Sequence, residues 1–253
     1  MARRIAQAIL DGRGTEHGGV YFDATGVGLE KLQKDYPSYL ERYANVGMDI
    51  SKEMMEIAPA PHTALGGVMV NDQCETDVKG LYACGEVIGG LHGANRIGGS
   101  AGLETLVFGR RAGDSCAKGV KELATVADGW DAWADALVNR AGSNEDPAQL
   151  RKVMQDALAK GAGVLRSEKE LTESLAALET VLAKAKELPS ENGIAGFTRL
   201  RLLNDAQAAV MVCRGALERK ESLGSHTRLD SQAPAEKPYR VVQSQKGCCR
   251  EDV

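Results

Sequence analysis

The glycine-rich segment at residues 91–100 places the strongest constraint on the fold, because it forces a tight loop immediately before a helix. It reads Leu-His-Gly-Ala-Asn-Arg-Ile-Gly-Gly-Ser, and its glycines let a large planar or anionic ligand approach the backbone closely. The free N–H groups at the start of the following helix favour negative charge. Arg96 can hold a carboxylate beside that ligand through two parallel hydrogen bonds. This arrangement is typical of a redox site for a small acid.

Three helical patterns follow one another in the C-terminal half of the chain. Asp146 is expected to cap the first helix. Ser167 and Glu170 form a capping box for the second helix, which ends before Pro189. The third helix is expected to run from about residue 198 to 219. Each helix has an apolar stripe, so the three are predicted to pack as a bundle. The stripes of the first two consist of Leu150, Val153, Met154, Ala157 and Leu158, and of Leu171, Leu175, Leu178, Leu182 and Ala185.

The rest of the chain mixes short helical and strand patterns. The first 60 residues predict a helix ending at Gly12, a strand at residues 20–23 and helical turns around residue 30 and after Pro37. Residues 56–88 are strand-like, with strands expected at 67–70 and 81–84. A helix is expected from 101 to about 118, and residues 231–253 are predicted to form an extended tail. The inward face of the 101–118 helix is expected to consist of Leu103, Leu106 and Val107.

Composition argues against a nucleic-acid-binding protein and against a membrane-spanning one. The net charge of −4 argues against non-specific nucleic-acid binding, and no run of about 20 apolar residues is long enough to cross a membrane. No apolar signal core follows the first four residues. The six cysteines are scattered without a metal-type C-x-x-C spacing, which favours reduced thiols in a cytoplasmic protein and no metal site.

Four segments, in order, resemble the flavoprotein subunit of the fumarate reductase and succinate dehydrogenase family. The resemblance covers nearly the whole chain but only the C-terminal half of the family. The matching segments are Pro-His-Thr-Ala-Leu-Gly-Gly at 61–67, Gly-Leu-Tyr-Ala-Cys-Gly-Glu at 80–86, His-Gly-Ala-Asn-Arg-Ile-Gly-Gly at 92–99 with Leu-Val-Phe-Gly-Arg at 106–110, and Arg-Lys-Glu-Ser-Leu-Gly-Ser-His-Thr-Arg at 219–228.

This resemblance implies an α+β fold, the C-terminal part of a two-domain FAD flavoprotein followed by a helical bundle. Residues 1–60 would be the C-terminal part of the capping domain and 61–118 that of the FAD-binding domain, followed by a helical domain at 119–230 and the tail at 231–253. The family's Gly-x-Gly-x-x-Gly loop, which cradles the dinucleotide pyrophosphate, is absent from this sequence. We therefore expect the chain to need an N-terminal FAD-binding half, and to bind FAD weakly or not at all by itself.

The resemblance also implies residue roles. Arg96 and His62 would anchor the two carboxylates of fumarate or succinate, although Thr63 and Leu65 replace the residues common beside that histidine. The family's proton donor is an arginine at the start of a capping-domain helix. Aligning the helix at residues 5–8 with it puts the donor at Ala2, and Arg3 and Arg4 lie one and two residues away. Three alternatives stay open: the donor has shifted, with Arg3 as the candidate; the start of the chain has removed it; or the protein does not reduce fumarate.

Six further residues are expected to contact FAD. Glu86, at the predicted end of a strand, would accept hydrogen bonds from ribose hydroxyls. Ser100 and Ala101 replace an Asn-Ser pair, so helix N–H groups rather than a hydroxyl would stabilise the reduced flavin. The complete set is Glu86, His92, Asn95, Gly99, Ser100 and Ala101.

The implied function is interconversion of succinate and fumarate by hydride transfer between FAD and a dicarboxylate. Electrons would pass to or from a partner iron–sulfur protein, at the inner face of the membrane if partner subunits hold the complex there. Two alternatives remain open: an enzyme similar to L-aspartate oxidase, which shares the His-Gly-Ala-Asn-Arg segment, and a non-catalytic split half that serves in assembly.

Overall fold

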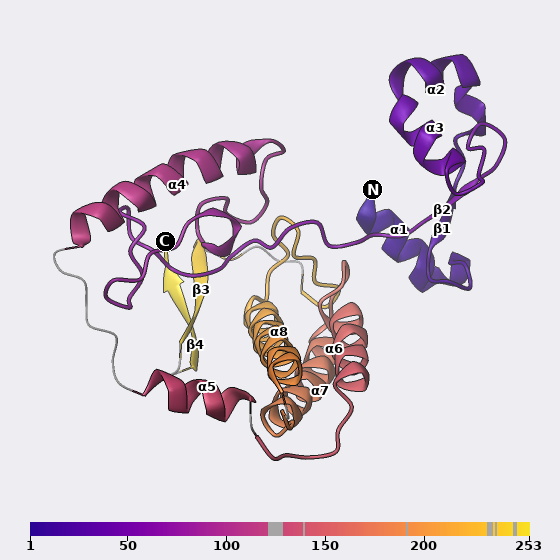
Figure 1. The fold of residues 1–253 in the computed structure, drawn as a ribbon. Coiled ribbons are helices and arrows are strands. Elements are labelled where there is room, and N and C mark those ends of the chain that lie inside the picture. The colour runs from indigo at the N-terminus through magenta and orange to yellow at the C-terminus, as the bar shows by residue number, and fades with distance from the viewer. Residues whose placement is uncertain (121–128, 139, 191, 232–234, 236, 245–246) are drawn as a thin grey trace. The chain divides into compact units, whose positions relative to one another are not determined.

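The computed structural model describes residues 1–120, 129–138, 140–190, 192–231, 235, 237–244 and 247–253. The chain divides into two compact units, Met1–His62 and Thr63–Val253, and Figure 1 labels the helices and strands of both. The architecture is the mixed α and β fold that the sequence predicts.

The first unit combines a two-stranded sheet with short helices. Helix α1 (Ala2–Ala8) continues into a π-helical turn, and β1 (Val20–Phe22) pairs antiparallel with β2 (Met55–Ile57). Between the strands lie α2 (Leu29–Asp35) and α3 (Pro37–Ala44). The small core of this unit is formed by Ala24, Ile50 and Met55, with Leu40, Tyr43, Met48 and Ile57 packed around it.

Residues 63–99 of the second unit form loops, and the strands predicted at 67–70 and 81–84 are wrong. Each segment makes a single bridge, Val68 with Ile88 and Glu75 with Tyr82. A strand needs a neighbour along its length to satisfy its backbone groups. Within the described part of the chain, neither segment has more than that one bridge. Glu86 likewise does not end a strand, because it lies in a 3-10 turn, Gly85–Val87.

Helix α4 (Ser100–Gly119) confirms the predicted helix, but its predicted inward face is wrong. Leu103 is 67% and Leu106 75% exposed, and Val107 is also exposed. The buried residues are Glu104 and Ala112. The described part of the unit therefore packs against the other side of this helix, and its most apolar face is left open.

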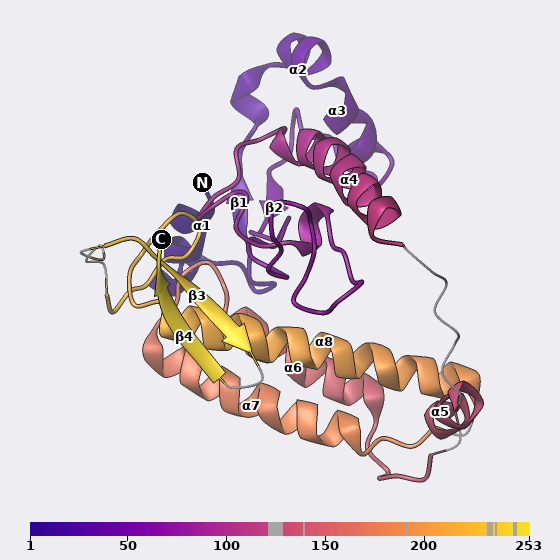
Figure 2. The ribbon, with the colours of Figure 1, turned by 90° about the vertical axis from the view of Figure 1, so that its left-hand side faces the viewer.

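The predicted helical bundle is confirmed (Figure 2). It consists of α6 (Pro147–Gly161), α7 (Glu168–Lys186) and α8 (Gly193–Glu218), with the shorter α5 (Trp130–Val138) against α8. Fully buried side chains from α7 and α8 form the centre: Leu171, Leu178, Leu202, Ala206 and Cys213.

The predicted caps explain where two of these helices begin. Asp146 accepts a hydrogen bond from the Ala148 amide, and Ser167 accepts one from the Glu170 amide. Helix α8 begins five residues earlier than predicted, because the Asn192 side chain caps it. Val153, predicted for the apolar stripe of α6, is 38% exposed and lies at the edge of that stripe.

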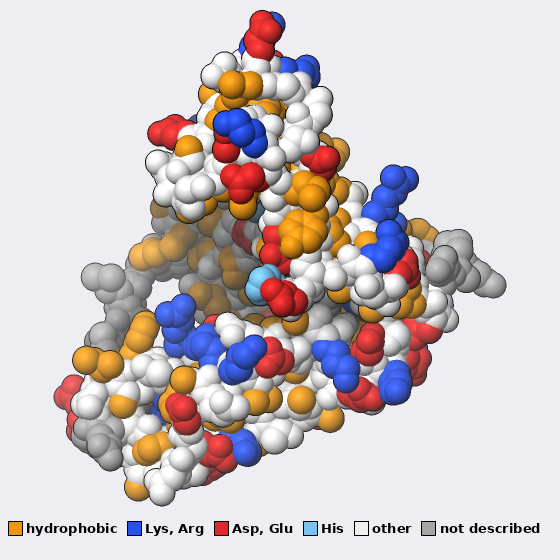
Figure 3. Space-filling view, turned by 90° about the vertical axis from the view of Figure 1, so that its right-hand side faces the viewer, with side chains coloured by type: hydrophobic (Ala, Val, Ile, Leu, Met, Phe, Trp, Pro, Cys, Tyr) orange, Lys and Arg blue, Asp and Glu red, His pale blue; other side chains and the backbone are white. Residues whose placement is uncertain are grey.

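The outer surface of the bundle carries charges of both signs, interspersed with one another (Figure 3). Some of them link helices, such as Arg151 with Asp205 at 2.8 Å and Lys160 with Glu173 at 2.6 Å. Such exposed pairs contribute little stability individually. No described helix is long and apolar enough to cross a membrane.

The C-terminal residues do not form an extended tail. Strands β3 (Tyr239–Ser244) and β4 (Gly247–Asp252) make an antiparallel hairpin. The hairpin is attached to α8, because Gln243 donates to the Met211 carbonyl at 2.7 Å and Arg250 donates to the Glu218 carbonyl at 2.8 Å. Contacts to a folded helix thus order a segment whose composition is typical of a tail.

Residues 219–230, which we call the return segment, lie between α8 and the hairpin and contain buried charges. The Arg228 side chain is fully buried and donates to both Asp230 carboxylate oxygens, at 2.7 and 2.9 Å. These hydrogen bonds hold the pKa of Asp230 well below its usual range. The backbone of Arg166, in the loop between α6 and α7, pairs with the segment on both sides of Arg228.

His226 of the return segment is buried in its neutral form. Its Nε2 donates to the Arg219 carbonyl at 3.1 Å, and its Nδ1 accepts from Arg166 at 2.8 Å. Burial lowers the pKa of His226 from 6.5 to about 4, opposed by the Arg219 carbonyl and aided by the positive charges of Arg166, Arg228 and Arg219. The neutral imidazole is the form that this packing stabilises.

Gly161→Ala should destabilise the bundle by about 1–3 kcal/mol. A Cβ at Gly161 would lie 2.5 Å from Ser174 Oγ and 2.6 Å from Ser174 Cβ, so α6 and α7 must separate. Gly113→Ala on α4 is the matched control, because its Cβ meets nothing within 4 Å and alanine favours a helix by up to ~1 kcal/mol. Urea unfolding of each variant measures both changes. Equal stability of Gly161→Ala and the unchanged chain would contradict the close packing.

The free energy of unfolding should fall as pH is lowered from 6.5 to about 4. In this window the unfolded chain binds a proton at His226 and the folded chain does not. The contribution of His226 to the free energy of unfolding is therefore complete above pH 6.5. It has decreased by on the order of 3 kcal/mol when the pH reaches about 4. Urea titrations across the window, with His226→Gln for comparison, measure this. A His226→Gln variant with the same pH slope as the unchanged chain would rule out His226 as the cause.

Candidate functional site

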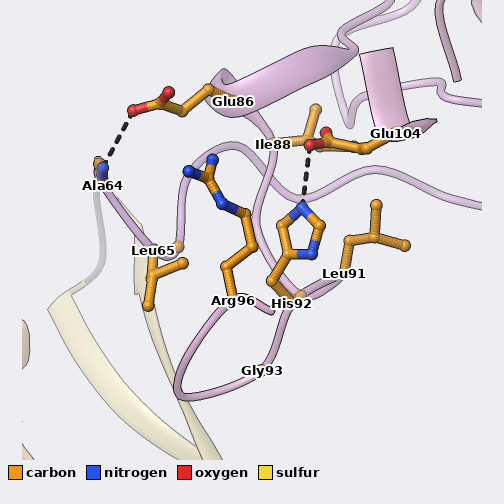
Figure 4. Close-up of a pocket in the computed structure, with 11 residues that line it drawn as sticks. Ala64, Leu65, Glu86, Ile88, Leu91, His92, Gly93, Arg96 and Glu104 are labelled. Carbon is orange, nitrogen blue, oxygen red and sulfur yellow. Dashed lines mark hydrogen bonds and ion pairs between the residues drawn. The ribbon is translucent and has the colours of Figure 1, made fainter. Parts of the chain in front are cut away.

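A pocket in the second unit is formed by the loops around residues 64–66 and 86–93 together with α4 (Figure 4). Its polar side chains are Glu86, His92, Arg96 and Glu104. Three of the predicted site residues, Glu86, His92 and Arg96, are therefore brought together from segments that are separate in the sequence.

Close backbone contact fixes one wall of the pocket. The Val68 amide donates to the Val87 carbonyl at 2.8 Å, and the Gly89 amide donates to the Val68 carbonyl at 3.0 Å. A Cβ at Gly67 would lie 2.7 Å from the Val87 carbonyl carbon and closer still to its oxygen. Glycine at position 67 therefore lets the two loops touch, which places residues 64–66 opposite residues 86–88.

Glu86 connects two of the loops that line the pocket. One oxygen of its exposed carboxylate accepts a hydrogen bond from the Ala64 amide at 3.0 Å (Figure 4). A carboxylate in this position can accept further hydrogen bonds from the hydroxyl groups of a ligand.

His92 and Glu104 form a polar pair in the pocket wall. His92 Nε2 lies 2.9 Å from Glu104 Oε2, and the Glu104 side chain is only 4% exposed (Figure 4). A buried carboxylate requires such a partner, because its desolvation is costly. Glu104 was not among the residues predicted for the site. The sequence carries no signal for it, because the apolar positions Leu103, Leu106 and Val107 mark a different face of the helix.

Arg96 lies in the pocket with a neutral side chain as its hydrogen-bond partner. It is half-buried, and its Nη1 donates to the Thr63 hydroxyl at 3.2 Å. Within the described ranges, no carboxylate forms an ion pair with Arg96. Because a partly buried guanidinium with only a neutral partner retains most of its hydrogen-bonding capacity, Arg96 can bind an anionic ligand.

The N-terminus of α4 follows directly after the Arg96 loop. Gly99, with φ of +85°, makes the left-handed turn into the helix, no side chain caps it, and its first turn contains no acidic residue. Its backbone N–H groups therefore favour a negative charge at this end. Asn95, Gly99, Ser100 and Ala101, all predicted to contact the cofactor, lie in this stretch.

The other two predicted catalytic residues belong to the first unit. Arg3 and His62 are both exposed there, and their roles stay predictions. No three described His, Cys, Asp or Glu side chains gather as a metal site.

Comparison with known proteins shows the family to which the chain belongs. Residues 2–101 match the FAD binding domain family, and residues 151–247 match the fumarate reductase flavoprotein C-terminal family. One subunit of the fumarate reductase (CoM/CoB) of Methanothermobacter marburgensis is 37% identical over 91% of this chain and 43% of its own length. L-aspartate oxidase of Yersinia pestis is 34% identical over 88% of this chain and 42% of its own length.

The solved Sdh1 complex of Mycobacterium smegmatis contains a chain that matches all of this one with a TM-score of 0.80 and 30% identity, over 46% of its own length. The chain thus spans less than half the length of the relatives that it matches. Both family matches and the site motifs agree with the resemblance inferred from the sequence. The chain belongs to the flavoprotein subunit family of fumarate reductase and succinate dehydrogenase and comprises the C-terminal half of that flavoprotein.

Proposed function

We propose that this chain is the C-terminal half of a flavoenzyme that interconverts succinate and fumarate by hydride transfer between FAD and the dicarboxylate. The observation that carries the proposal is Arg96, a half-buried guanidinium without a carboxylate partner among the described residues, placed just before an uncapped helix N-terminus. A dicarboxylate offers the planar anionic group that this guanidinium matches.

The residues around the pocket fit FAD. Glycines line the loops, the α4 N-terminus has no side-chain cap, and the Glu86 carboxylate can accept hydrogen bonds from ribose hydroxyls. When bound, FAD would supply the hydride acceptor or donor that no amino-acid side chain provides. The residues that would hold it are Glu86, His92, Asn95, Gly99, Ser100 and Ala101.

The chain's own residues would bind and orient the substrate. Arg96 would hold one carboxylate through two N–H donors, while the Thr63 hydroxyl fixes the guanidinium orientation through Nη1. His62 would bind the other carboxylate. Arg3 would deliver the proton to the substrate carbon; a guanidinium is a weak acid, so closeness to the substrate has to compensate.

We propose that the N-terminal FAD-binding half of the flavoprotein packs on the open face of α4. Leu103 and Leu106 are 67% and 75% exposed on neighbouring turns of one helix, and exposed apolar faces of this kind mark sites where another polypeptide packs. Such a half would contribute the dinucleotide loop that cradles the FAD pyrophosphate. In this account residues 1–60 complete a capping domain and 61–118 complete the FAD-binding domain.

Further partners follow from the family. We propose that an iron–sulfur subunit donates or accepts the electrons, and that the location is cytoplasmic, including the inner face of a membrane when partner subunits hold the complex there. The support is that a solved neighbour is a complex of this family.

An activity similar to L-aspartate oxidase is the second candidate, and its specific support is the 34% identity to such an oxidase. Aspartate and succinate differ by one amino group, and both offer the carboxylate that Arg96 would bind, so the pocket residues described above suit both. Turnover of aspartate with oxygen, in the absence of fumarate turnover, would favour this candidate.

Arg96→Lys should lower kcat/KM for fumarate about 100-fold, because lysine keeps the charge but loses the parallel pair of donors. Steady-state fumarate reduction by the assembled flavoprotein measures the effect. Arg110→Lys is the control, because that side chain is 86% exposed on α4. If both variants retain full activity, Arg96 does not hold the substrate and the proposed function fails.

Replacing Leu103 and Leu106 together by serine should weaken assembly with the N-terminal half by at least ~10-fold, because two apolar contacts are lost. The measurement is the affinity of the two halves expressed as separate polypeptides, with flavin absorbance of the assembled protein as a second readout. Ile194→Ser, which changes an 83% exposed residue on α8, should leave the affinity unchanged. Equal losses in both variants would contradict docking on α4.

A further inference from the structure

The return segment touches the loop that carries Arg96. Residues 223–226 form a tight turn, in which the Leu223 amide donates to the His226 carbonyl at 2.9 Å and the His226 amide donates to the Leu223 carbonyl at 3.0 Å. From this turn the Ser225 amide donates to the Ala94 carbonyl at 3.3 Å. Ala94 is two residues before Arg96, so the contact reaches the site through backbone rather than through side chains.

Gly224 leaves no space between the turn and the loop. A Cβ at this position would lie 2.5 Å from the Ala94 carbonyl carbon, 2.8 Å from the Ala94 Cβ, and closer still to the carbonyl oxygen. Its φ of +59° is also a conformation that other residues adopt with difficulty. Because the obstacle is backbone, a side chain at position 224 cannot be accommodated by a rotamer change, and the loop or the turn must move.

The turn itself is firmly held by the helical bundle. The Arg166 amide donates to the Thr227 carbonyl at 2.9 Å, and the Leu229 amide donates to the Arg166 carbonyl at 2.8 Å. The Arg166 side chain donates to the Gly163 carbonyl at 2.9 Å and to His226 at 2.8 Å. Hydrogen bonds and the backbone of residues 225 and 226 therefore link the loop between α6 and α7 to the Ala94 carbonyl.

We infer that Gly224 is a positioning residue, through which the helical bundle sets the place of the Arg96 loop and thereby of the guanidinium that binds a substrate carboxylate. The second part of this inference rests on the proposed function. The first part concerns only the loop. In the absence of this support, three glycines between residues 93 and 99 would leave the loop many alternative conformations.

The test is the rate of trypsin cleavage after Arg96 in the 253-residue chain, followed by mass spectrometry. Gly224→Ala should raise this rate about tenfold, because cleavage requires the loop to open. Cleavage after Lys184, on the surface of α7, reports whether the bundle remains folded. The matched control is Gly80→Ala, where φ is +82° and an added Cβ meets nothing within 4 Å. A cleavage rate after Arg96 that is no higher in Gly224→Ala than in Gly80→Ala would overturn the inference.

If Gly224→Ala also unfolds the bundle, the His226→Gln variant tests whether the return segment holds the Arg96 loop. It adds no bulk against Ala94 but removes the imidazole that links the turn to Arg166. The expected result is at least ~3-fold faster cleavage after Arg96 with unchanged cleavage after Lys184. Unchanged cleavage at Arg96 in this variant would overturn the inference.

Kinetics of the assembled flavoprotein test the second part. Gly224→Ala should raise KM for fumarate about tenfold, with a smaller change in kcat, because the carboxylate-binding arginine is displaced while the reacting groups remain. If cleavage after Arg96 is faster but KM is unchanged, Gly224 does not affect substrate binding, although it still positions the Arg96 loop. Failure of the proposed function itself would be seen separately, in the Arg96→Lys variant.

Discussion

The backbone contact between Gly224 and Ala94 is the constraint on which the site geometry depends. It joins a loop that has little structure of its own to a bundle with a continuous apolar core. A glycine-rich loop lets a large ligand approach the backbone closely. The same loop cannot by itself hold an arginine in one position, because glycine restricts the backbone so little. The rigidity has to come from elsewhere, and in this chain it comes from the turn that His226, Arg166 and Arg228 fix.

Two arginines of the second unit, Arg228 and Arg96, have different surroundings and different roles. In the return segment, Arg228 is buried and fully compensated by Asp230 and by backbone carbonyls, so it serves the fold. In the pocket, Arg96 is only half-buried and has a neutral hydroxyl as its partner. Because Arg228 is buried and paired, it stabilises the fold, whereas Arg96 is available to bind an anionic ligand.

Local signals made part of this structure predictable from the sequence. Asp146 and Ser167 mark helix starts because capping depends on only a few neighbouring residues. The strands predicted at 67–70 and 81–84 are wrong because a strand depends on a partner that local sequence does not specify. Leu103 and Leu106 show the same difficulty: periodicity identifies an apolar face but not what covers it. Within the site, Arg96, His92 and Glu86 were found through motifs, whereas Glu104 and the Gly224 contact became visible only in three dimensions.

In the proposed site, Arg96 binds a dicarboxylate from a loop that the return segment holds in place. A crystal structure of the assembled flavoprotein with malonate is the test, because the two carboxylates of malonate share one methylene carbon and no carbon–carbon double bond can form between them. We expect one malonate carboxylate within hydrogen-bonding distance of two Arg96 nitrogens, with the turn at 223–226 still against Ala94. A malonate bound away from Arg96, or an Arg96 guanidinium paired with a protein carboxylate in the assembled protein, would contradict it.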